Sequence, residues 1–381
     1  MKSDKTTPNV PTLRFQEFTN PWTLMPLKKL LCFQNGINAD SAKYGKGVKF
    51  ISVSDILNNQ YITYDCIKGM IDIDKKTKER FLVEYGDILF QRSSETFEDI
   101  GRANVYLDKE HPATFGGFVI RGKKISEYNP MFFRYLLCTP NARKQTVRMG
   151  AGAQHYNIGQ DGLGKISLYF PTIQEQQKIA GFLSAIDDRI SVQNKIISKY
   201  ETLIKGLCDM IFRHDKSASL SDLVKCKTSA LQENMVSTCR RGEYKVLGAS
   251  GAIAVIDTYQ FDESGILVLK DGSKAGKIQF AQGKYSVIGT SVVLIPNEAC
   301  DARYLYFAMS SIDFEKYKVG SGIPHIYFKD YSNERIYYPD KALRKKITKT
   351  LDFYETMVEI ERKMLSAMQK QKAFLLQSMF I

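Results

Sequence analysis

The feature that most constrains the fold is a long helical pattern that occurs twice. From Ile179 onward, apolar residues recur at alternating steps of four and three, and the same pattern resumes 168 residues later from Ile347. This heptad spacing is typical of a helix that packs along its length against another helix. The interval is a multiple of seven, so the two patterns keep the same phase. Even a polar interruption recurs in place, as Gln193 and Glu361.

We call the apolar positions of these two patterns the seam. The predicted seam residues are Ile179, Leu183, Ile186, Ile190, Ile197, Ile204 and Leu207 in the first helix, and Ile347, Leu351, Tyr354, Val358, Leu365, Met368 and Leu375 in the second.

Each pattern predicts a helix of roughly 40 residues, or about 60 Å at ~1.5 Å per residue. A buried stripe in a globular core is the other interpretation of such a pattern, but this length exceeds the width of a small domain. Pro171 and Pro339 precede the helices, Thr172 and Glu175 are spaced as a capping box, and Asp340 is placed as an N-cap. The second globular segment lies between the helices in sequence, so helices that pack together must be antiparallel.

The segments that precede the helices also correspond. Apolar strand-like runs at 86–95 and 264–273 are followed by short amphipathic patterns at 129–140 and 301–311. Glycine-rich stretches at 150–158 and 320–328 follow, with Gly and His in register 170 residues apart. The sequence therefore predicts an α+β protein with a pseudo-twofold repeat, in which two similar globular segments are separated by two long helices that form an antiparallel intramolecular coiled coil.

The predicted divisions are an N-terminal arm (1–22), a first globular segment (23–170), a first helix (171–215), a second globular segment (216–338) and a second helix (339–381).

Composition narrows the functional classes. A net charge of +13 and a pI near 9.2 favour a polyanionic partner, and the excess is spread along the chain. The seven cysteines are scattered without a C-x-x-C pair, which indicates reduced core residues rather than a zinc site. No apolar run is long enough for a membrane helix, and the first ten residues lack the apolar core of a secretory signal, so a cytoplasmic protein is expected.

Three fragments imitate catalytic motifs. "GQDGLGKI" (159–166) has the spacing of a phosphate-binding loop, but Ile166 occupies the Ser/Thr position and a strand pattern follows it. "NPMF" (129–132) is similar to a methyltransferase tetrad but is better explained by Asn129 capping a helix. The nuclease-like set of Pro339, Asp340, Glu361 and Lys363 places its glutamate on a helix seam. We therefore expect no catalytic residue and no metal site in this chain.

Four stretches resemble the specificity subunit of Type I restriction-modification enzymes, and the resemblance extends over nearly the whole chain. They are "VPTLRFQEFTNPWTLMPLKKL" (10–30), "KFISVSDI" (49–56), "FPTIQEQQKIAGFLSAIDDRI" (170–190, with its echo at 338–358) and "GILVLKDGSKAGKI" (265–278). The second helix opens with "DKALRKK" where the first has "TIQEQQ", a departure from the family pattern.

The resemblance implies a cytoplasmic prokaryotic protein in which each globular segment is a target recognition domain. Each domain would read one half of a split double-stranded DNA sequence. The helices would set the distance between the halves and dock two methyltransferase subunits and the restriction subunits. S-adenosylmethionine, ATP and Mg are then expected in those partners and not in this chain.

Candidate DNA-binding residues are the basic, amide and aromatic residues of the glycine-rich loops, since Arg and Lys suit guanine edges or phosphates and Gln suits adenine. In the first segment they are Arg92, Ser93, Ser94, Arg102, Arg148, Gln154, His155 and Tyr156. In the second they are Lys270, Asp271, Ser273, Lys274, Lys277, Ser321, His325 and Tyr327. For each of them a solvated surface charge or a structural histidine is the alternative.

Other interpretations stay open at this point. The basic run at 341–349 opens a helix, where its dipole disfavours cations, so an anion such as DNA phosphate or an acidic partner is one explanation and a solvated face is another. For the whole chain, the rivals are a single-chain nuclease or methyltransferase with unrecognised motifs and a coiled-coil scaffold that binds only protein.

Overall fold

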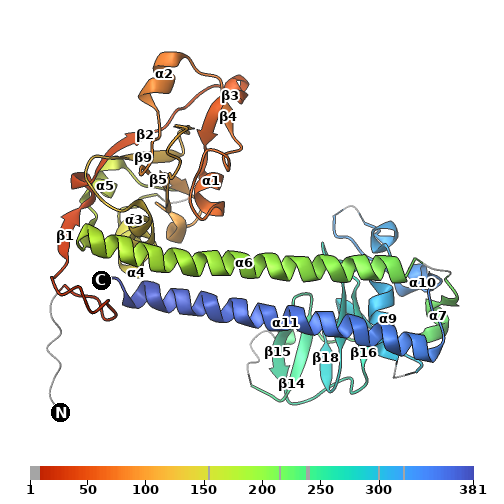
Figure 1. The fold of residues 1–381 in the computed structure, drawn as a ribbon. Coiled ribbons are helices and arrows are strands. Elements are labelled where there is room, and N and C mark those ends of the chain that lie inside the picture. The colour runs from red at the N-terminus through yellow and green to blue at the C-terminus, as the bar shows by residue number, and fades with distance from the viewer. Residues whose placement is uncertain (1–8, 153–154, 214–215, 237–240, 299–300, 321) are drawn as a thin grey trace, which may run out of the picture. The chain divides into compact units, whose positions relative to one another are not determined.

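The computed structural model describes the chain except for residues 1–8, 153–154, 214–215, 237–240, 299–300 and 321 (Figure 1). The chain divides into two compact units. Unit 1 contains the residues up to Val192 together with Leu365–Ile381, and unit 2 contains Gln193–Met364. Each unit holds one mixed globule and one stretch of each long helix.

The two long helices predicted from the heptad pattern are present. Helix α6 covers Ile173–Ile211 and helix α11 covers Lys341–Ser378 (Figure 1). The Thr172 hydroxyl accepts a hydrogen bond from the Glu175 backbone N–H at 3.4 Å. The Asp340 carboxylate accepts bonds from two backbone N–H groups in the first turn of α11, at 2.9 and 3.0 Å. Both predicted helix starts are thus confirmed by their caps.

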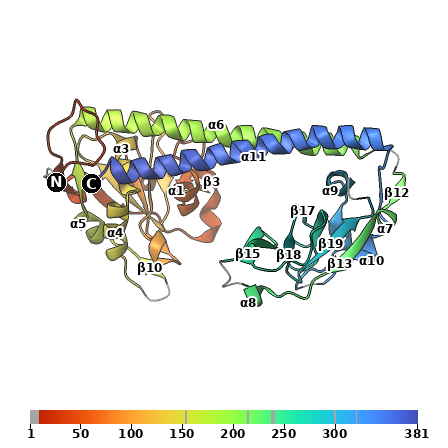
Figure 2. The ribbon, with the colours of Figure 1, turned by 90° about the horizontal axis from the view of Figure 1, so that it is seen from below.

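The helical stretches run antiparallel within each unit. In unit 2 the Gln193 amide donates to the Glu361 backbone oxygen at 3.1 Å and also to its carboxylate, and further along the rings of Tyr200 and Tyr354 lie 6.4 Å apart. In unit 1 an ion pair joins Lys372 to Asp187. The two polar seam residues singled out in the sequence are therefore bonded to each other. Figure 2 shows α6 and α11 side by side in each unit.

Unit 1 contains the first eleven strands and five short α-helices. The strands are β1 (Thr23–Pro26), β2 (Leu31–Asn35), β3 (Tyr44–Ile51), β4 (Met70–Ile71), β5 (Ile88–Gln91), β6 (Ser93–Ser94), β7 (Ala103–Val105), β8 (Thr114–Phe115), β9 (Val119–Lys124), β10 (Tyr156–Asn157) and β11 (Ser167–Phe170). The helices are α1 (Val53–Asn58), α2 (Lys75–Arg80), α3 (Pro130–Leu137), α4 (Pro140–Arg148) and α5 (Gln160–Lys165), with 3-10 turns at Leu27–Lys29, Ser41–Lys43 and Phe97–Asp99.

Unit 2 repeats this composition with fewer elements. Its strands are β12 (Ala218–Ser219), β13 (Val224–Thr228), β14 (Tyr244–Gly248), β15 (Gly251–Ile256), β16 (Gly265–Leu269), β17 (Ile278–Ala281), β18 (Tyr285–Val287), β19 (Ser291–Pro296) and β20 (Arg335–Ile336). Its helices are α7 (Leu220–Leu223), α8 (Glu233–Val236), α9 (Ala302–Met309) and α10 (Phe328–Tyr331), with a 3-10 turn at Phe314–Tyr317.

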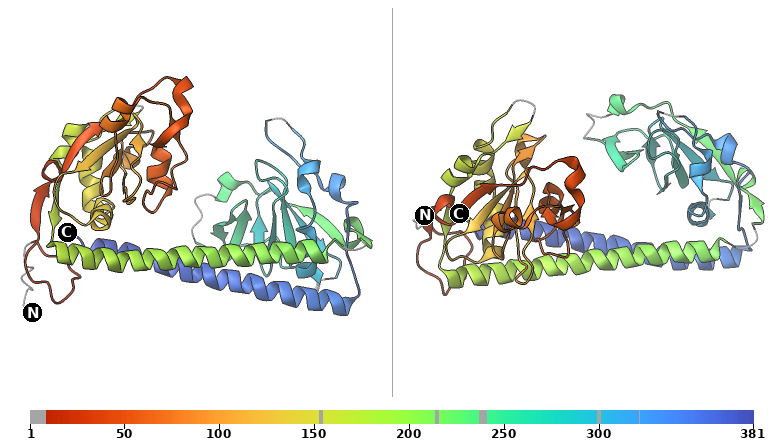
Figure 3. Two further views of the ribbon diagram at one scale, coloured as in Figure 1. Left: turned by 45° about the horizontal axis from the view of Figure 1, so that its top comes forward. Right: turned by 90° about the horizontal axis from the view of Figure 1, so that it is seen from above.

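The sheets of the two units have the same topology (Figure 3). An antiparallel sheet is ordered β2-β9-β5-β7 in unit 1 and β13-β19-β16-β17 in unit 2. A three-stranded sheet is ordered β4-β3-β8 and β15-β14-β18, with one parallel pair in each, β3 with β8 and β14 with β18. A two-stranded pair closes each globule, β1-β11 and β12-β20. The predicted α+β repeat is confirmed down to strand order.

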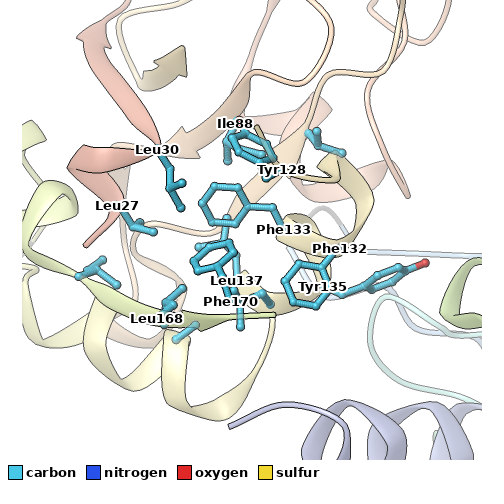
Figure 4. Close-up of a cluster of buried hydrophobic side chains, with 14 of the residues drawn as sticks. Leu27, Leu30, Ile88, Tyr128, Phe132, Phe133, Tyr135, Leu137, Leu168 and Phe170 are labelled. Carbon is cyan, nitrogen blue, oxygen red and sulfur yellow. The ribbon is translucent and has the colours of Figure 1, made fainter. Parts of the chain in front are cut away.

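Each globule is fixed to the helices by the short helix that the sequence predicted at 129–140 or 301–311. In unit 1, α3 contributes Phe132, Phe133 and Tyr135 to a core that also contains Leu183 of α6 and Leu375 of α11. Figure 4 shows the α3 side chains packed among residues of the sheet and of β11. In unit 2, α9 occupies the same place, and its Tyr304 and Phe307 share a core with Leu351 of α11.

A hydrogen-bonded tie reinforces each of these contacts. In unit 1 the Gln176 side chain accepts from the Asn129 backbone N–H at 2.9 Å and donates to the Pro171 oxygen at 3.0 Å. In unit 2 Arg344 takes this place, because it donates to both carboxylate oxygens of Asp301, at 3.0 and 2.9 Å, and to the Pro339 oxygen at 2.6 Å. Gln176 and Arg344 are separated by the same 168 residues as the seam.

The cysteines depart in part from the core positions expected of them. Cys208 is buried, but Cys32 and Cys138 are exposed, and Cys66 and Cys226 are half-buried. All five of these described cysteines are free thiols. Among the described helices, not one is long and apolar enough to span a lipid bilayer.

Candidate nucleic-acid interface

In unit 1 the glycine-rich loop is joined to the loop that follows the central strand β5. The Ile158 N–H donates to the Arg92 oxygen at 3.0 Å, and Ala151 and Asn157 exchange both backbone hydrogen bonds, at 2.9 and 2.8 Å. Strand β10 continues this contact, since Asn157 is paired with Ser93. We call this set of backbone hydrogen bonds the loop frame of unit 1.

Unit 2 has a loop frame of the same construction after its central strand β16. The Ile326 N–H donates to the Lys270 oxygen at 2.9 Å, and Val319 and His325 exchange both backbone hydrogen bonds, at 2.9 and 2.8 Å. A bridge also joins Asp271 to His325.

The two loop frames superimpose in sequence at the interval of the helices. Ala151, Asn157 and Ile158 correspond to Val319, His325 and Ile326, each pair separated by 168 residues. The positive-φ glycines Gly152 (φ +142°) and Gly320 (φ +98°) correspond in the same way, and a Cβ on either would collide with a carbonyl oxygen of its own loop.

The expected pairing of His155 with His325 at an interval of 170 is therefore wrong. The residue equivalent to His325 is Asn157, which sequence reasoning did not select. The interval of the helix repeat was the signal that could have identified it, whereas matching the letters Gly and His placed the register two residues away.

The side chains within the two frames form different pairs. In unit 1 the Ser93 hydroxyl donates to the Asn157 side-chain oxygen. In unit 2 the Asp271 carboxylate lies 2.8 Å from the His325 Nδ1, and both side chains are partly exposed, at 31% and 38%. The same backbone construction thus presents an amide in one unit and an imidazole in the other.

A cavity of about 430 Å³ opens beside the loop frame of unit 1. Its lining includes the side chains of Asn35, Arg92, Asn157 and Gln160. Arg92 is half-buried and donates to the Gly117 oxygen at 3.3 Å, which holds its guanidinium near the cavity. Amide and guanidinium groups that converge on an open cavity are the groups that read base edges in DNA. Asn35 and Gln160 were also missed by the sequence analysis.

The remaining candidates of unit 1 lie around this frame. Ser94 is buried and its hydroxyl accepts from the Thr96 N–H at 3.2 Å. Tyr156 packs edge-on against Phe97, with 5.2 Å between ring centroids. His155 and Arg148 are exposed, and Gln154 lies outside the described residues.

Arg102 is partly occupied by an ion pair. Its Nε lies 2.6 Å from Asp99, and hydrogen bonds from Thr96 and Arg102 hold the pKa of Asp99 below its usual value. Both side chains are exposed, so this pair adds little stability and leaves Arg102 able to exchange partners.

In unit 2, Lys270 is half-buried at the frame, while Ser273, Lys274 and Tyr327 are exposed around it. The Lys329 ammonium lies 5.6 Å from the Tyr327 ring centroid. Lys277 lines a different cavity of about 1310 Å³, together with Arg303 of α9. Ser321 lies outside the described residues.

The seam residues are separated cleanly from their neighbours by burial. Ile179, Leu183, Ile197, Ile347, Leu351, Val358 and Leu375 are buried, and Ile186, Ile190, Ile204, Leu207, Tyr354, Leu365 and Met368 are half-buried. A second apolar stripe on α11 faces solvent, and it contains Phe353, Ile360, Met364 and Phe374. On α6, Val192 and Met210 are exposed in the same way.

The basic run at the start of α11 has two kinds of members. Arg344 is committed to Asp301 and lies 4.0 Å from the Tyr338 ring centroid. Lys341, Lys345, Lys346 and Lys349 are exposed. Within the described ranges, no group of three or more His, Cys, Asp or Glu side chains is placed to hold a metal ion.

Comparison with known proteins identifies relatives over most of the chain. The family model described as the Type I restriction modification DNA specificity domain matches twice, at residues 21–202 and 216–369. A putative type I restriction enzyme MjaX specificity subunit of Methanocaldococcus jannaschii is 22% identical, over 93% of this chain and 92% of that protein. The MjaVIII specificity subunit of the same organism is 28% identical, but the match spans only 31% of this chain and 28% of that protein.

A solved structure has the same fold. The S subunit of a Type I restriction-modification system from M. genitalium aligns with a TM-score of 0.61 at 15% sequence identity, covering 98% of this chain and 99% of that one. At this identity the likeness establishes the fold.

Proposed function

The chain belongs to the Type I restriction-modification DNA specificity family, and on that premise we propose that its two globules each read one half of a split DNA target. The family match covers both repeats separately. Each repeat has its own sheet, its own loop frame and its own set of basic and polar side chains at that frame.

The observation that carries this proposal is the pair of loop frames. The backbone construction is the same in both units, while the side chains it presents differ. Base edges are read by side chains held at a fixed backbone position. Two equal frames with different side chains therefore suit a target whose two halves have different sequences.

We further propose that the exposed apolar stripes of α6 and α11 dock methyltransferase subunits, through which the restriction subunits join. Phe353 is 57% exposed and Phe374 61%, and both lie on one face of a helix whose seam is already occupied. Large exposed apolar side chains in a row are typical of a protein-binding surface. In this arrangement S-adenosylmethionine, ATP and Mg belong to the partners, and this chain is a non-catalytic subunit.

The experiment is to co-express the chain with the methyltransferase subunit of its own system and to sequence the modified sites in DNA. We expect one split target that consists of two short specific sequences and an unread spacer. A continuous target, or modification without sequence preference, would contradict the proposal.

Two parallel assays separate the rival functions. The isolated chain is incubated with DNA and labelled S-adenosylmethionine, and separately with DNA and Mg. Turnover in either assay would identify a single-chain enzyme. A gel shift with the assembled complex that shows no binding to DNA would instead favour a protein scaffold.

A further inference from the structure

The side-chain pair at each loop frame leaves one hydrogen-bonding atom directed by its partner. In unit 1 the Ser93 hydroxyl donates to the Asn157 oxygen, so that oxygen is engaged. The Asn157 amide nitrogen carries two hydrogens, of which one reaches the His155 backbone oxygen at 3.4 Å. The remaining N–H is a donor.

In unit 2 the partner has the opposite effect. An ionised Asp271 only accepts hydrogen bonds, so the Nδ1 of His325 at 2.8 Å must carry the proton of the neutral ring. The other ring nitrogen, Nε2, is then an acceptor. Within the described part of the chain, Nε2 has no hydrogen-bond partner.

We infer that this pair is a specificity-determining device in each reader, with donor polarity in unit 1 and acceptor polarity in unit 2. This inference rests on the proposed function. Asn157 selects a base with a major-groove acceptor, which is a purine N7 or O6 or the thymine O4. His325 selects a base with an exocyclic amino group, which is the adenine N6 or the cytosine N4. Ser93 and Asp271 are positioning residues that fix these polarities.

Three observations point to the frame rather than to its neighbours. The backbone hydrogen bonds that hold positions 157 and 325 are the same in both units, so the side chains leave equivalent backbone positions. Both side chains are at least partly exposed. In unit 1, Asn157 lines an open cavity together with Arg92, whose guanidinium is suited to an adjacent guanine edge or phosphate.

The first test exchanges the pairs between frames. The double variant S93D/N157H installs the unit 2 pair in unit 1, and D271S/H325N installs the unit 1 pair in unit 2. Each is assembled with the methyltransferase subunit, and the modified sites are sequenced from a library with randomised half-sites. We expect the preference at one position of one half to change from acceptor-bearing to amino-bearing bases, or the reverse, by about ten- to a hundredfold.

The matched control is H155N, in the same loop but outside the frame, which should leave the recognised sequence unchanged. An active exchange variant with an unchanged sequence would overturn the inference while the split target, and with it the proposed function, remained. A wild-type complex without any split target would instead be a failure of the proposed function.

A second test needs no variant, so it stays decisive if an exchange variant does not fold. Duplexes carry single base analogues at each position of the half-sites mapped for the wild type, and binding by the wild-type complex is titrated. A 7-deazapurine or a 4-thiothymine should weaken binding at one position of the first half. Purine in place of adenine, or 2-pyrimidinone in place of cytosine, should weaken it at one position of the second. Analogue effects confined to the opposite halves, or absent from both, would overturn the inference.

Discussion

At residue scale, positions 176 and 344 show how the repeat has diverged while keeping its contacts. Gln176 ties α6 to α3 with neutral hydrogen bonds, whereas Arg344 ties α11 to the start of α9 with a bidentate ion pair. The Arg344 and Asp301 side chains are only 8% and 5% exposed. Tyr338 adds a hydrogen bond to the same carboxylate. A buried pair of this kind costs much more when one partner is removed than when both are replaced.

We therefore expect Asp301→Ala to lower the free energy of unfolding by about 3–5 kcal/mol, because it leaves the Arg344 charge buried without its partner. The double variant D301L/R344M should recover much of that loss. Urea denaturation of the purified chain measures both. The control is Lys345→Met, at an exposed neighbour in the same helix, which should stay within about 0.5 kcal/mol. A single variant as stable as the wild type would show that the tie does not hold α9 to the helix.

Residue-scale features divide into those that local pattern reveals and those that it does not. The caps at Asn129 and Asp340 follow from residue type and position, and the structure confirms both. Asn157 could not be found in that way, because its role depends on backbone bonds to a loop about sixty residues earlier in the chain. The Glu175 carboxylate, expected to complete a capping box, instead binds Arg14 at 2.7 Å and Trp22 at 3.3 Å.

At element scale, the two faces of α11 have separate tasks. Leu351 is fully buried in the core of unit 2, and Phe353, two residues later, is 57% exposed. Periodicity predicted the first face, since a seam leaves a repeating signal in the sequence. The strand order of the sheets left no such signal, because pairing between distant strands depends on contacts that no local spacing encodes.

These adjacent positions give a matched pair of substitutions. Leu351→Ala should lower the free energy of unfolding by about 2–5 kcal/mol through the cavity it creates. Phe353→Ala should leave stability nearly unchanged but weaken binding of the methyltransferase subunit, as measured by titration calorimetry. Equal affinity of the Phe353→Ala chain and the wild type for that subunit would remove this face from the docking surface.

At the scale of the whole molecule, the chain enters and leaves the second globule at one place. Strands β12 and β20 pair Ala218 with Ile336, and the Ser217 hydroxyl donates to the Tyr338 oxygen at 3.1 Å. A segment whose ends meet in this way can be replaced without changing the connections to α6 and α11.

Exchange of residues 216–338 for the matching segment of a relative should therefore change one half of the recognised sequence and leave the other half and the spacer as they were. Sequencing of modified sites reads out both halves in a single experiment. Exchange of 23–170 is the reciprocal control and should change only the other half. New bases in both halves after one exchange would mean that the globules do not read independently.

The helices offer the last test, of whether they set the distance between the two half-sites. Both α6 and α11 extend from unit 1 into unit 2, and Gln193 is bonded to Glu361 where the stretch assigned to unit 2 begins. Inserting a copy of 194–200 after Gln193 and a copy of 354–360 before Glu361 adds one heptad to each helix, keeps the seam in phase and preserves that bond. Each helix lengthens by about 10 Å at ~1.5 Å per residue, and with ~3.4 Å per base pair the spacer should grow by roughly three base pairs while both half-sites stay the same. Activity should fall somewhat, because about three added pairs also rotate one half-site by roughly a quarter turn or more, at ~10 pairs per turn, and that twist must be absorbed. Insertion into α6 alone, which puts the seams out of step, should abolish assembly. An assembled, active double insertion that modifies sites with the original spacer would show that the helices do not determine the spacing.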